Sequence, residues 1–481
     1  MESPNLRMLM VLLPKLPLIV REAIMHILGL SEPAKYLDLH SALVISVIRS
    51  LIEPSASRPP SVSSVQKLTL KDPGVKGRLW VSTYASPSPP ETSIRDELMQ
   101  ALDDMRGSRL EDTQIATPEL ISIEAEWTGH RPAASPKEPL PNVSNKELYS
   151  KMMEDCTQPT TILYLHGGAF YVCDPITHRP VTSKLAKLTG GRCYSVRYRL
   201  SPQHPFPAAL LDALLSYMTL LYPPPDAYHE PVKPQHLVIA GDSAGGNLTL
   251  ALLQLLLQLR RRNTTILWYG ERRKIPLPAA VGCNSPWLDI TQSFPSWEGE
   301  GYAPFDYLPK PAIVERAGVK DCAVWPAKPP RKHIYVNDEL ITHPLATVLM
   351  SKSWEGAPPV YICTGWEILG PEDKFFAKKL AADGVPVVLE EYEAMPHCFA
   401  MLLTKTPGAK RCFDGWAGFI RAAVSDPESV LESRAVFIEA RTLKETRLEF
   451  ESLSSVSEEQ IQDRILAKAS LTTVAQTSPK L

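Results

Sequence analysis

Short apolar runs alternate with longer amphipathic segments through the middle of the chain, beginning near residue 160. Such runs between polar turns are typical of buried strands, and they fall at residues 161–166, 193–198, 237–240, 279–284, 360–364 and 385–392. Helical patterns occupy intervening segments at residues 180–189, 207–221, 248–259 and 373–383. This alternation predicts an α/β fold of the doubly wound type, in which helices cover both faces of a mostly parallel sheet.

Two further helices are predicted ahead of the sheet, over residues 8–30 and 36–52. In the second, apolar residues recur every three or four positions and form one stripe: Leu39, Leu43, Val44, Val47, Ile48 and Leu51. The simplest interpretation is that both helices pack on the main domain as part of a cap. The alternative is a surface helix that touches a membrane or guides a lipophilic substrate.

The other segments suggest how the chain divides. A Pro/Ser-rich linker at 53–65 precedes two alternating runs around Asp72-Pro73-Gly74, which predict a hairpin of strands within residues 65–84. A helix is expected near residues 96–105, and residues 121–127 predict another strand.

Two long stretches lack a strand–helix pattern. Residues 285–359 are rich in Pro and Trp, and an insertion of that size predicts a lid or a substrate-binding wall. Beyond residue 422 the pattern is helical and charged, and about the last ten residues are predicted to be disordered. We therefore expect N-terminal cap helices and linker at 1–60, a main α/β domain with its insertion at 61–425, and a C-terminal helix and tail at 426–481.

Composition narrows the class of protein. With 44% hydrophobic and 22% charged residues, the chain of 481 residues matches a globular protein, and its net charge of −2 argues against nucleic acid as a partner. The eight cysteines are scattered without metal-ligand spacing, so reduced thiols are expected, with no metal and no cofactor. With no signal-peptide pattern and no uninterrupted apolar span, we expect a cytoplasmic protein, with peripheral contact at the endoplasmic reticulum membrane as the alternative.

The segment Gly241-Asp242-Ser243-Ala244-Gly245 lies between an apolar strand and a Leu-rich helix. Strand, Gly-x-Ser-x-Gly and helix is the sequence form of a nucleophile elbow, in which a sharp turn lifts the serine hydroxyl out of the sheet. Glycines on both sides let neighbouring backbone approach closely. The helix N-terminus beside Ser243 would favour a developing negative charge.

Upstream, the strand at 161–166 ends in the glycine-rich segment His166-Gly167-Gly168-Ala169-Phe170. Ester hydrolysis passes through a tetrahedral oxyanion, which needs backbone N–H donors placed about 3 Å from the charge. Small residues let the backbone come that close. Gly167 and Gly168 are therefore predicted to form an oxyanion hole together with the N–H of Ala244.

A serine nucleophile needs a base, and the base needs an acid to orient it. Among the eleven histidines, His397 directly follows the last predicted strand, on the sheet edge that carries the elbow. The acid is expected in the loop after the preceding strand, where Glu367 is the first choice and Asp373 the second. Glu372 is predicted to cap the following helix.

Five motifs in order resemble the hormone-sensitive-lipase branch of the α/β-hydrolase fold: residues 166–170, Tyr-Arg-Leu-Ser-Pro-Gln-His-Pro-Phe-Pro-Ala-Ala-Leu-Leu-Asp at 198–212, Gly-Asp-Ser-Ala-Gly-Gly-Asn at 241–247, Ser-Pro-Trp-Leu-Asp at 285–289, and His397. The resemblance spans roughly residues 160–422. It implies an eight-stranded sheet, a cap built from the N-terminus and an insertion, and a carboxylesterase-type mechanism. The family's Asp-x-Leu-x-Asp acid motif reads Glu367-Ile-Leu-Gly-Pro371 here.

The leading hypothesis is a serine hydrolase of carboxylic esters with a short acyl group and a lipophilic alcohol portion, similar to fungal esterases and deacetylases of this branch. An acyltransferase that uses the same triad would look the same in sequence, because the difference lies in how water is excluded. The third reading is a non-catalytic binding protein on this fold. Intact Ser243 and His397 argue against it.

Overall fold

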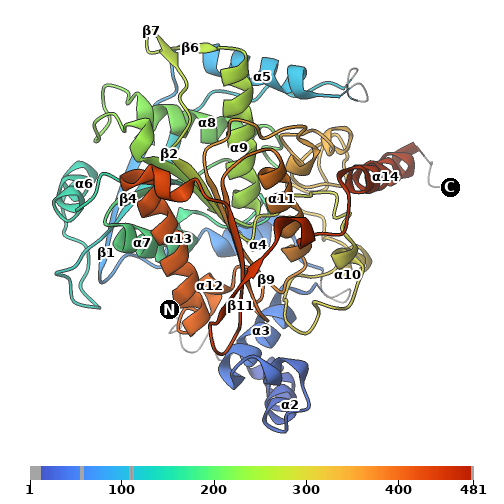
Figure 1. Cartoon of the computed structure of the whole chain (residues 1–481). Helices are drawn as coiled ribbons and strands as arrows, with labels where there is room; N and C mark the ends of the chain where they lie inside the picture. Colours follow the sequence, from blue (N-terminus) through green and yellow to red (C-terminus); the bar gives the residue numbers. More distant parts are fainter. Residues whose placement is uncertain (1–11, 55–58, 108–109, 111–112, 478–481) are drawn as a thin grey trace.

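A computed structural model of the chain describes residues 12–54, 59–107, 110 and 113–477. Its centre is a ten-stranded sheet (Figure 1). In spatial order the strands are β1 (Leu79–Ser86), β2 (Ile123–His130), β4 (Arg192–Val196), β3 (Thr161–Leu165), β5 (Leu237–Asp242), β8 (Ala280–Asn284), β9 (Val360–Gly365), β10 (Val387–Tyr392), β11 (Arg434–Ile438) and β12 (Glu445–Leu448). The strands from β4 to β11 are parallel, whereas β1, β2 and β12 pair antiparallel at the two edges.

Helices cover both faces, so successive residues of a central strand enter different cores. In β3, Leu163 and Leu165 pack in the cluster that contains α8 (Ala208–Leu221), α9 (Ala244–Arg261) and α11 (Gly370–Ala382). Ile162 and Tyr164 pack in the cluster that contains α7 (Pro175–Thr189) and α13 (Pro407–Ser425). Burial on both faces explains why these strands are continuously apolar in sequence. The α/β, mostly parallel architecture predicted from the alternation is confirmed.

The sheet has ten strands where the resemblance implied eight. The two additional strands, β11 and β12, come from the region after residue 422 that was expected to be helical, and that expectation is wrong there. Ala435, Val436 and Ile438 of β11 are buried beside β10. A run of so few apolar residues is too short to separate strand from helix by periodicity. The expected C-terminal helix is α14 (Glu458–Thr477), and the end of the predicted disordered tail lies outside the described residues.

The hairpin predicted within residues 65–84 is also wrong. Its first half is a helix, α4 (Val62–Thr69), whose N-cap Ser61 accepts the N–H of Ser64. Val62 and Gln66 are buried four positions apart, and Gln66 Nε2 donates to the carbonyl of Ser201 at 2.9 Å. Helix capping and this contact outweigh an alternation that fits a strand equally well.

The remaining elements lie outside the ten-stranded sheet. The larger ones are α5 (Ser93–Met105), α6 (Asn145–Glu154), α10 (Pro311–Ala317), α12 (Phe399–Leu402) and the hairpin of β6 (Thr265–Trp268) and β7 (Glu271–Lys274). Short 3₁₀ helices are η4 (Pro234–His236), η5 (Pro295–Trp297), η6 (Asp338–Leu340), η7 (Val348–Met350), η8 (Pro427–Val430) and η9 (Phe450–Ser452). The insertion at 285–359 thus contains one α-helix of two turns, three short 3₁₀ helices and otherwise irregular backbone.

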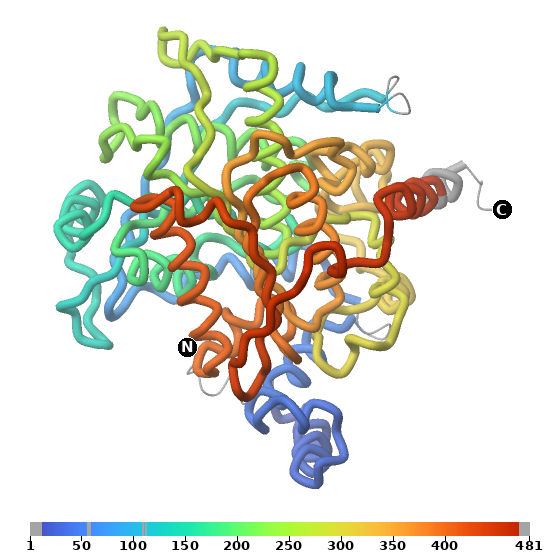
Figure 2. Tube along the Cα trace, viewed as in Figure 1, coloured from blue at the N-terminus to red at the C-terminus, as the bar shows by residue number. Residues whose placement is uncertain are grey.

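The N-terminal helices α2 (Leu16–Ile27) and α3 (Leu39–Ile52) agree with the two predicted helices, apart from residues 8–11, which lie outside the described part. The 3₁₀ turns η1 (Leu13–Lys15) and η2 (Glu32–Lys35) flank α2. Figures 1 and 2 show α2 projecting from the body of the molecule, with α3 between it and the sheet domain. In the described chain, no helix has the length and apolar character needed to cross a bilayer. The division into three parts at residues 60 and 425 stays a prediction.

Candidate active site

Ser243 lies at the turn between β5 and α9. Its backbone has φ 52° and ψ −123°, a strained conformation for a residue with a side chain. Two hydrogen bonds hold this turn: the Ser243 N–H donates to the carbonyl of Asn284 at 3.0 Å, and the N–H of Trp287 donates to the Ser243 carbonyl at 2.9 Å. The hydroxyl therefore has a fixed position at the carboxyl end of the sheet, before the first turn of a long helix.

The glycines on either side of Ser243 are required by close packing of backbone. A Cβ on Gly245 would lie 2.1 Å from the carbonyl oxygen of Leu165, and one on Gly241 would lie 2.4 Å from the carbonyl oxygen of Gly245. Neither contact is sterically allowed. The Gly-x-Ser-x-Gly spacing thus follows from how tightly the elbow packs against the end of β3.

His397 and Glu367 meet Ser243 from the loops that follow β10 and β9. His397 Nε2 lies 2.9 Å from Ser243 Oγ, and His397 Nδ1 lies 2.5 Å from Glu367 Oε2. His397 is 154 positions from Ser243 and 30 from Glu367 in sequence, yet the three residues form one hydrogen-bonded line. This is the geometry of a serine nucleophile, a base and an orienting acid.

Glu367 is fully buried and its second oxygen is also bound. Oε1 accepts hydrogen bonds from Ser285 Oγ at 2.5 Å, from the Gly365 N–H at 3.0 Å and from Thr364 Oγ1 at 3.2 Å. These donors stabilise a carboxylate and leave Oε2 for the histidine. Ser285 Oγ in turn accepts the N–H of Cys398, the residue after His397, at 3.2 Å.

The electrostatic surroundings favour a protonated His397. Burial by itself lowers the pKa of the imidazole, but the charge and hydrogen bond of Glu367, followed by the charges of Asp306 and Asp242, outweigh it and raise the pKa above its ordinary value of 6.5. These carboxylates would therefore stabilise the imidazolium that forms when His397 accepts a proton.

The two other carboxylates of this loop do not contact His397. Asp373 is fully buried on α11, where burial and then the charge of Glu367 raise its pKa well above the ordinary range. Glu372 does not cap the helix as predicted, because its carboxylate accepts the backbone N–H of Leu288 at 2.7 Å. Both are side chains within α11, whereas Glu367 precedes the helix and is free to face the histidine.

The predicted oxyanion donors differ in what their N–H groups do. The Gly167 N–H donates to Asp242 Oδ1 at 3.2 Å. Among the residues that the structure describes, no acceptor is seen for the N–H of Gly168 or of Ala244. Gly168 has φ 107°, and a Cβ there would lie 2.3 Å from the carbonyl oxygen of Val172. The role of Gly167 as a donor stays a prediction.

Asp242, Ser285 and Asp306 support the site, and sequence reasoning gave none of them a role. Asp242 is buried beneath the elbow, where it accepts hydrogen bonds from Tyr164 Oη at 2.7 Å and from Gly167. Asp242 lies in the motif at 241–247 and Ser285 in the motif at 285–289, so the sequence carries a signal for both positions. Asp306 lies in the irregular insertion, where no pattern marks it.

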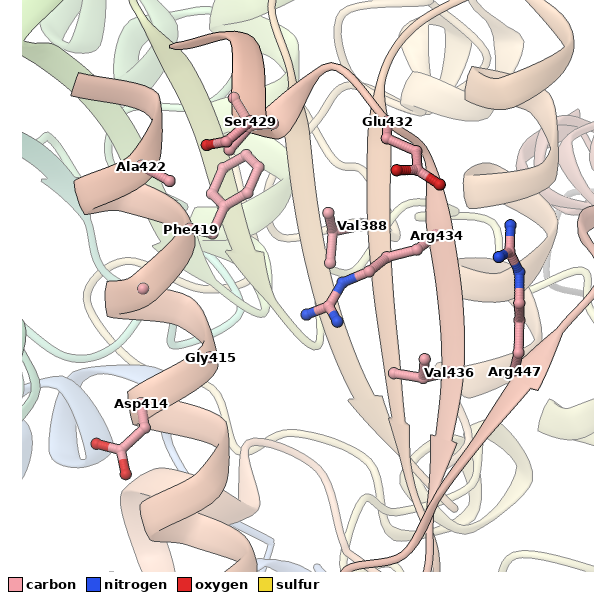
Figure 3. A pocket seen from close by; sticks show the side chains of 12 residues that line it. Val388, Asp414, Gly415, Phe419, Ala422, Ser429, Glu432, Arg434, Val436 and Arg447 are labelled. Carbon is pink, nitrogen blue, oxygen red and sulfur yellow. The ribbon is translucent and has the colours of Figure 1, made fainter. Parts of the chain in front are cut away.

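A hollow of about 540 Å³ on another part of the surface is unrelated to this site (Figure 3). It lies between α13 and the strands β10, β11 and β12, with Phe419 and Val388 at its floor and Arg434 extending toward the helix. Its lining includes two acidic residues, Glu432 and Asp414, and two arginines, Arg434 and Arg447. None of its lining residues touches Ser243, His397 or Glu367, so it has no part in the chemistry of the triad.

A mostly parallel sheet with a serine on a strand-to-helix turn, followed in the chain by its acid and then its histidine, defines a serine hydrolase of the α/β class. A family model described as alpha/beta hydrolase fold matches residues 162–401. An acetyl-hydrolase of Streptomyces hygroscopicus is 29% identical over 267 residues, which cover 55% of this chain and 77% of that protein. The esterase LipU of Mycobacterium tuberculosis is 30% identical over 270 residues, covering 54% and 77%.

Among solved structures, the HSL homologue EstE7 from a metagenome library has a TM-score of 0.53 at 21% identity and covers 81% of this chain and 100% of that one. At this identity the likeness shows the fold alone. The fold and the sequence relatives point to the same family. The chain belongs to the alpha/beta hydrolase family, as a carboxylic ester hydrolase.

Proposed function

We propose that Ser243 is the nucleophile, His397 the general base and acid, and Glu367 the acid that orients the imidazole. The observation that carries this proposal is the pair of hydrogen bonds at His397, 2.9 Å to Ser243 and 2.5 Å to Glu367. Glu367 accepts at Nδ1, which leaves the Nε2 lone pair directed at the hydroxyl.

The reaction then follows from this arrangement. Ser243 Oγ attacks the ester carbonyl carbon while its proton passes to His397 Nε2, and the free N–H groups of Gly168 and Ala244 donate to the oxyanion. Collapse of this intermediate breaks the bond to the alcohol, which takes the proton from His397. Water, deprotonated by the same imidazole, releases the acid from the acyl-enzyme.

Labelling with a fluorophosphonate tests the nucleophile. We expect the wild-type protein to be labelled at Ser243 and Ser243→Ala to be unlabelled, with hydrolysis of p-nitrophenyl acetate lowered at least about 10⁴-fold. Ser195→Ala is the matched control, since that hydroxyl is buried in β4 away from the site. Unchanged labelling or activity in Ser243→Ala would rule out the assignment.

We further propose that the substrate has an uncharged, lipophilic alcohol portion and a short acyl group. Aromatic rings lie on two sides of the triad: the Tyr307 ring is 6.0 Å from that of His397, and Trp287, whose N–H donates to the Ser243 carbonyl, lies 6.2 Å from the ring of Phe170. Such surfaces favour apolar groups over charged ones.

Rates on p-nitrophenyl esters of increasing acyl length test the acyl preference, and a series of acetate esters with alcohols of increasing apolar area tests the alcohol. We expect kcat/KM to fall with acyl length and to rise with the apolar area of the alcohol. Addition of an acceptor alcohol separates hydrolysis from acyl transfer, because a transferase would form the new ester in preference to the free acid. A preference for long acyl chains or charged alcohols would contradict the proposal.

We also infer that α2 contacts a lipid surface. Large apolar side chains are exposed along this helix at three- and four-residue intervals, from Leu16 through Val20 and Ile24 to Ile27, which is 70% exposed. The opposite side of α2 packs on α3. An exposed apolar stripe on a projecting helix suits the interface of a bilayer, where a lipophilic ester would also reside.

Flotation with phosphatidylcholine vesicles tests this contact. Val20→Ser combined with Ile24→Ser should lower the floated fraction several-fold, while Val143→Ser with Leu431→Ser, which changes exposed apolar residues elsewhere, should not. Equal flotation of the two variants would contradict the lipid contact. A concentration-dependent dimer that the α2 variant abolishes would instead assign the stripe to a second copy of the chain.

A further inference from the structure

The loops of the base and the acid share a partner in the insertion, the buried residue Asp306. Its Oδ1 accepts the backbone N–H of His397 at 3.2 Å, and its Oδ2 accepts the backbone N–H of Ile368 at 2.8 Å. Ile368 directly follows Glu367. One carboxylate therefore ties the backbone of the triad histidine to the backbone beside the triad acid.

The N-terminal helix α3 holds the main chain of this same residue. Arg49 donates to the carbonyl oxygen of Asp306 from Nε at 2.9 Å and from Nη2 at 2.6 Å. The two residues are 257 positions apart in sequence. A planar guanidinium that donates twice to one oxygen fixes both partners in direction as well as distance.

Aromatic contacts reinforce this link. Tyr36, shortly before α3, lies edge to face with Phe305 at 5.7 Å and with Trp366 at 5.3 Å between ring centroids, and Phe305 meets Trp366 at 5.4 Å. Phe305 precedes Asp306, and Trp366 precedes Glu367. The N-terminal segment thus contacts the insertion next to Asp306 and the acid loop next to Glu367.

We propose that Asp306 is a positioning residue that fixes the loops of His397 and Glu367 relative to each other, and that Arg49 extends this support to the N-terminal helices. This inference rests on the proposed roles of Ser243, His397 and Glu367. It makes α3 a structural part of the active site in addition to a cap. The consequence is catalytic: a loop shift of about 1 Å at the base can cost on the order of 100-fold in rate.

Asp306 also acts on the base through its charge. The groups that face His397 are the carboxylates of Glu367, Asp306 and Asp242, the ring of Tyr307 and the thiol of Cys398. The three carboxylates favour the imidazolium. Removing one of them should lower the pKa of His397, and a residue that only holds the fold would leave that pKa where it is.

Asp306→Asn tests the proposal. The amide keeps one acceptor but turns an NH₂ toward the second backbone N–H, so we expect kcat to fall roughly 10- to 100-fold with KM little changed. The acid limb of the kcat/KM profile should move to lower pH. Asp289→Asn is the matched control, because that buried aspartate of the same insertion accepts the N–H groups of Thr291 and Ser293, within its own turn. It should lower stability without moving the limb.

Arg49→Ala tests the second part of the proposal, the link from Asp306 to the N-terminal helices. It also keeps the proposal testable if Asp306→Asn does not fold. We expect kcat to fall about threefold to tenfold, Arg49→Lys to recover part of it, and the effect to be less than additive with Asp306→Asn. Arg441→Ala is the control, since this arginine also donates to a main-chain oxygen of the N-terminal segment, that of Ala34 at 2.7 Å. It should leave kcat unchanged.

Two results would overturn the inference. The first is that Asp306→Asn has the same kcat and the same acid limb as Asp289→Asn. The second is that Arg49→Ala has the same kcat as Arg441→Ala. Failure of the proposed function looks different. If Ser243→Ala kept its activity, the triad itself would be wrong whatever the Asp306 variants did. With Ser243→Ala inactive and Asp306→Asn fully active with an unmoved limb, only the positioning role is lost.

Discussion

The two halves of the proposed active site are held in different ways. On the nucleophile side, the position of Ser243 follows largely from its own neighbours: a strand, a turn with two glycines and a helix, all between Leu237 and Arg261. On the other side, His397 and Glu367 lie on loops whose positions depend on Ser285 and Asp306, residues from the insertion. The first half is fixed by backbone geometry and by backbone hydrogen bonds to Asn284 and Trp287, and the second by side-chain hydrogen bonds from other segments.

This difference shows where the site is open to adjustment. The backbone around the elbow is packed too closely for an added Cβ at Gly241 or Gly245. A change there is therefore expected to move the elbow backbone itself. Hydrogen bonds to loops can be weakened one at a time, and each loss should lower the rate without unfolding the protein. Variants of the two halves should therefore fail in different ways.

On the loop side, the largest expected effect is at the acid itself. Glu367→Gln should lower kcat roughly 10³- to 10⁴-fold, because an amide NH₂ facing Nδ1 favours the tautomer with the proton on Nε2, which cannot accept from Ser243. Glu367→Asp should retain more activity, since it keeps a carboxylate. Steady-state hydrolysis of p-nitrophenyl acetate measures both.

Glu372→Gln is the control for this change. Glu372 is a buried glutamate five positions away, its pKa is raised well above the ordinary range by burial and by Asp289, and a neutral amide oxygen can still accept from Leu288. It should keep most of the activity. Equal loss in the two variants would show that Glu367 acts through the fold instead of through His397.

Gly245→Ala breaks the nucleophile side. The new Cβ would lie 2.1 Å from the carbonyl oxygen of Leu165, so the elbow backbone has to move. We expect a stability loss of about 1–3 kcal/mol or more and an activity loss on the order of 100-fold, measured by thermal unfolding and kinetics together. Gly418→Ala, on α13 with nothing within 4 Å of its new Cβ, should instead be neutral or slightly stabilising.

The pH dependence sharpens the comparison, because the base lies on the loop side and has to lose its proton before it can act. The base must be neutral to accept the proton of Ser243, so activity is lost as pH falls through the pKa of His397. That pKa is raised above 6.5 because nearby carboxylates outweigh burial. The acid limb of kcat/KM should therefore have its midpoint above 6.5, with a tenfold loss per pH unit below it. A midpoint below 6.5 would contradict this electrostatic account.

The same contrast decides what could be predicted from the sequence. Ser243 and the strand–helix alternation around it could be predicted because elbow geometry and hydrophobic periodicity are local properties of a segment. His397 is indicated by its place after a strand and Glu367 by its loop, although Asp373 fits the spacing almost as well. The choice between them is made by which side chain faces the imidazole, and that depends on where α11 begins.

Asp306 could not have been predicted, because its role exists only when three separate segments meet. The α4 helix and the strands β11 and β12 were missed for a related reason. Their apolar runs are short enough to suit either period, and the choice is made by a tertiary contact, Gln66 with Ser201 in one case and β11 with β10 in the other. Short elements are decided by their partners.

A smaller effect than at Glu367 or Gly245 is expected at Ser285, whose hydroxyl joins the acid loop to the base loop. It donates to Glu367 at 2.5 Å and accepts from Cys398 at 3.2 Å. Ser285→Ala removes both bonds and keeps the Cβ, so the cost of the positive φ of 48° is unchanged and the hydroxyl alone is tested. We expect kcat to fall about tenfold, which corresponds to about 1.4 kcal/mol, with KM nearly constant.

Ser195→Ala again supplies the comparison, since it removes a buried hydroxyl that has no hydrogen-bond partner among the described residues. It should not lower kcat, and it should leave stability equal or slightly higher. If Ser285→Ala matched it, the acid would be held by the N–H of Gly365 and the hydroxyl of Thr364 alone. The loop side would then be as local as the elbow, and the contrast between the two halves would disappear.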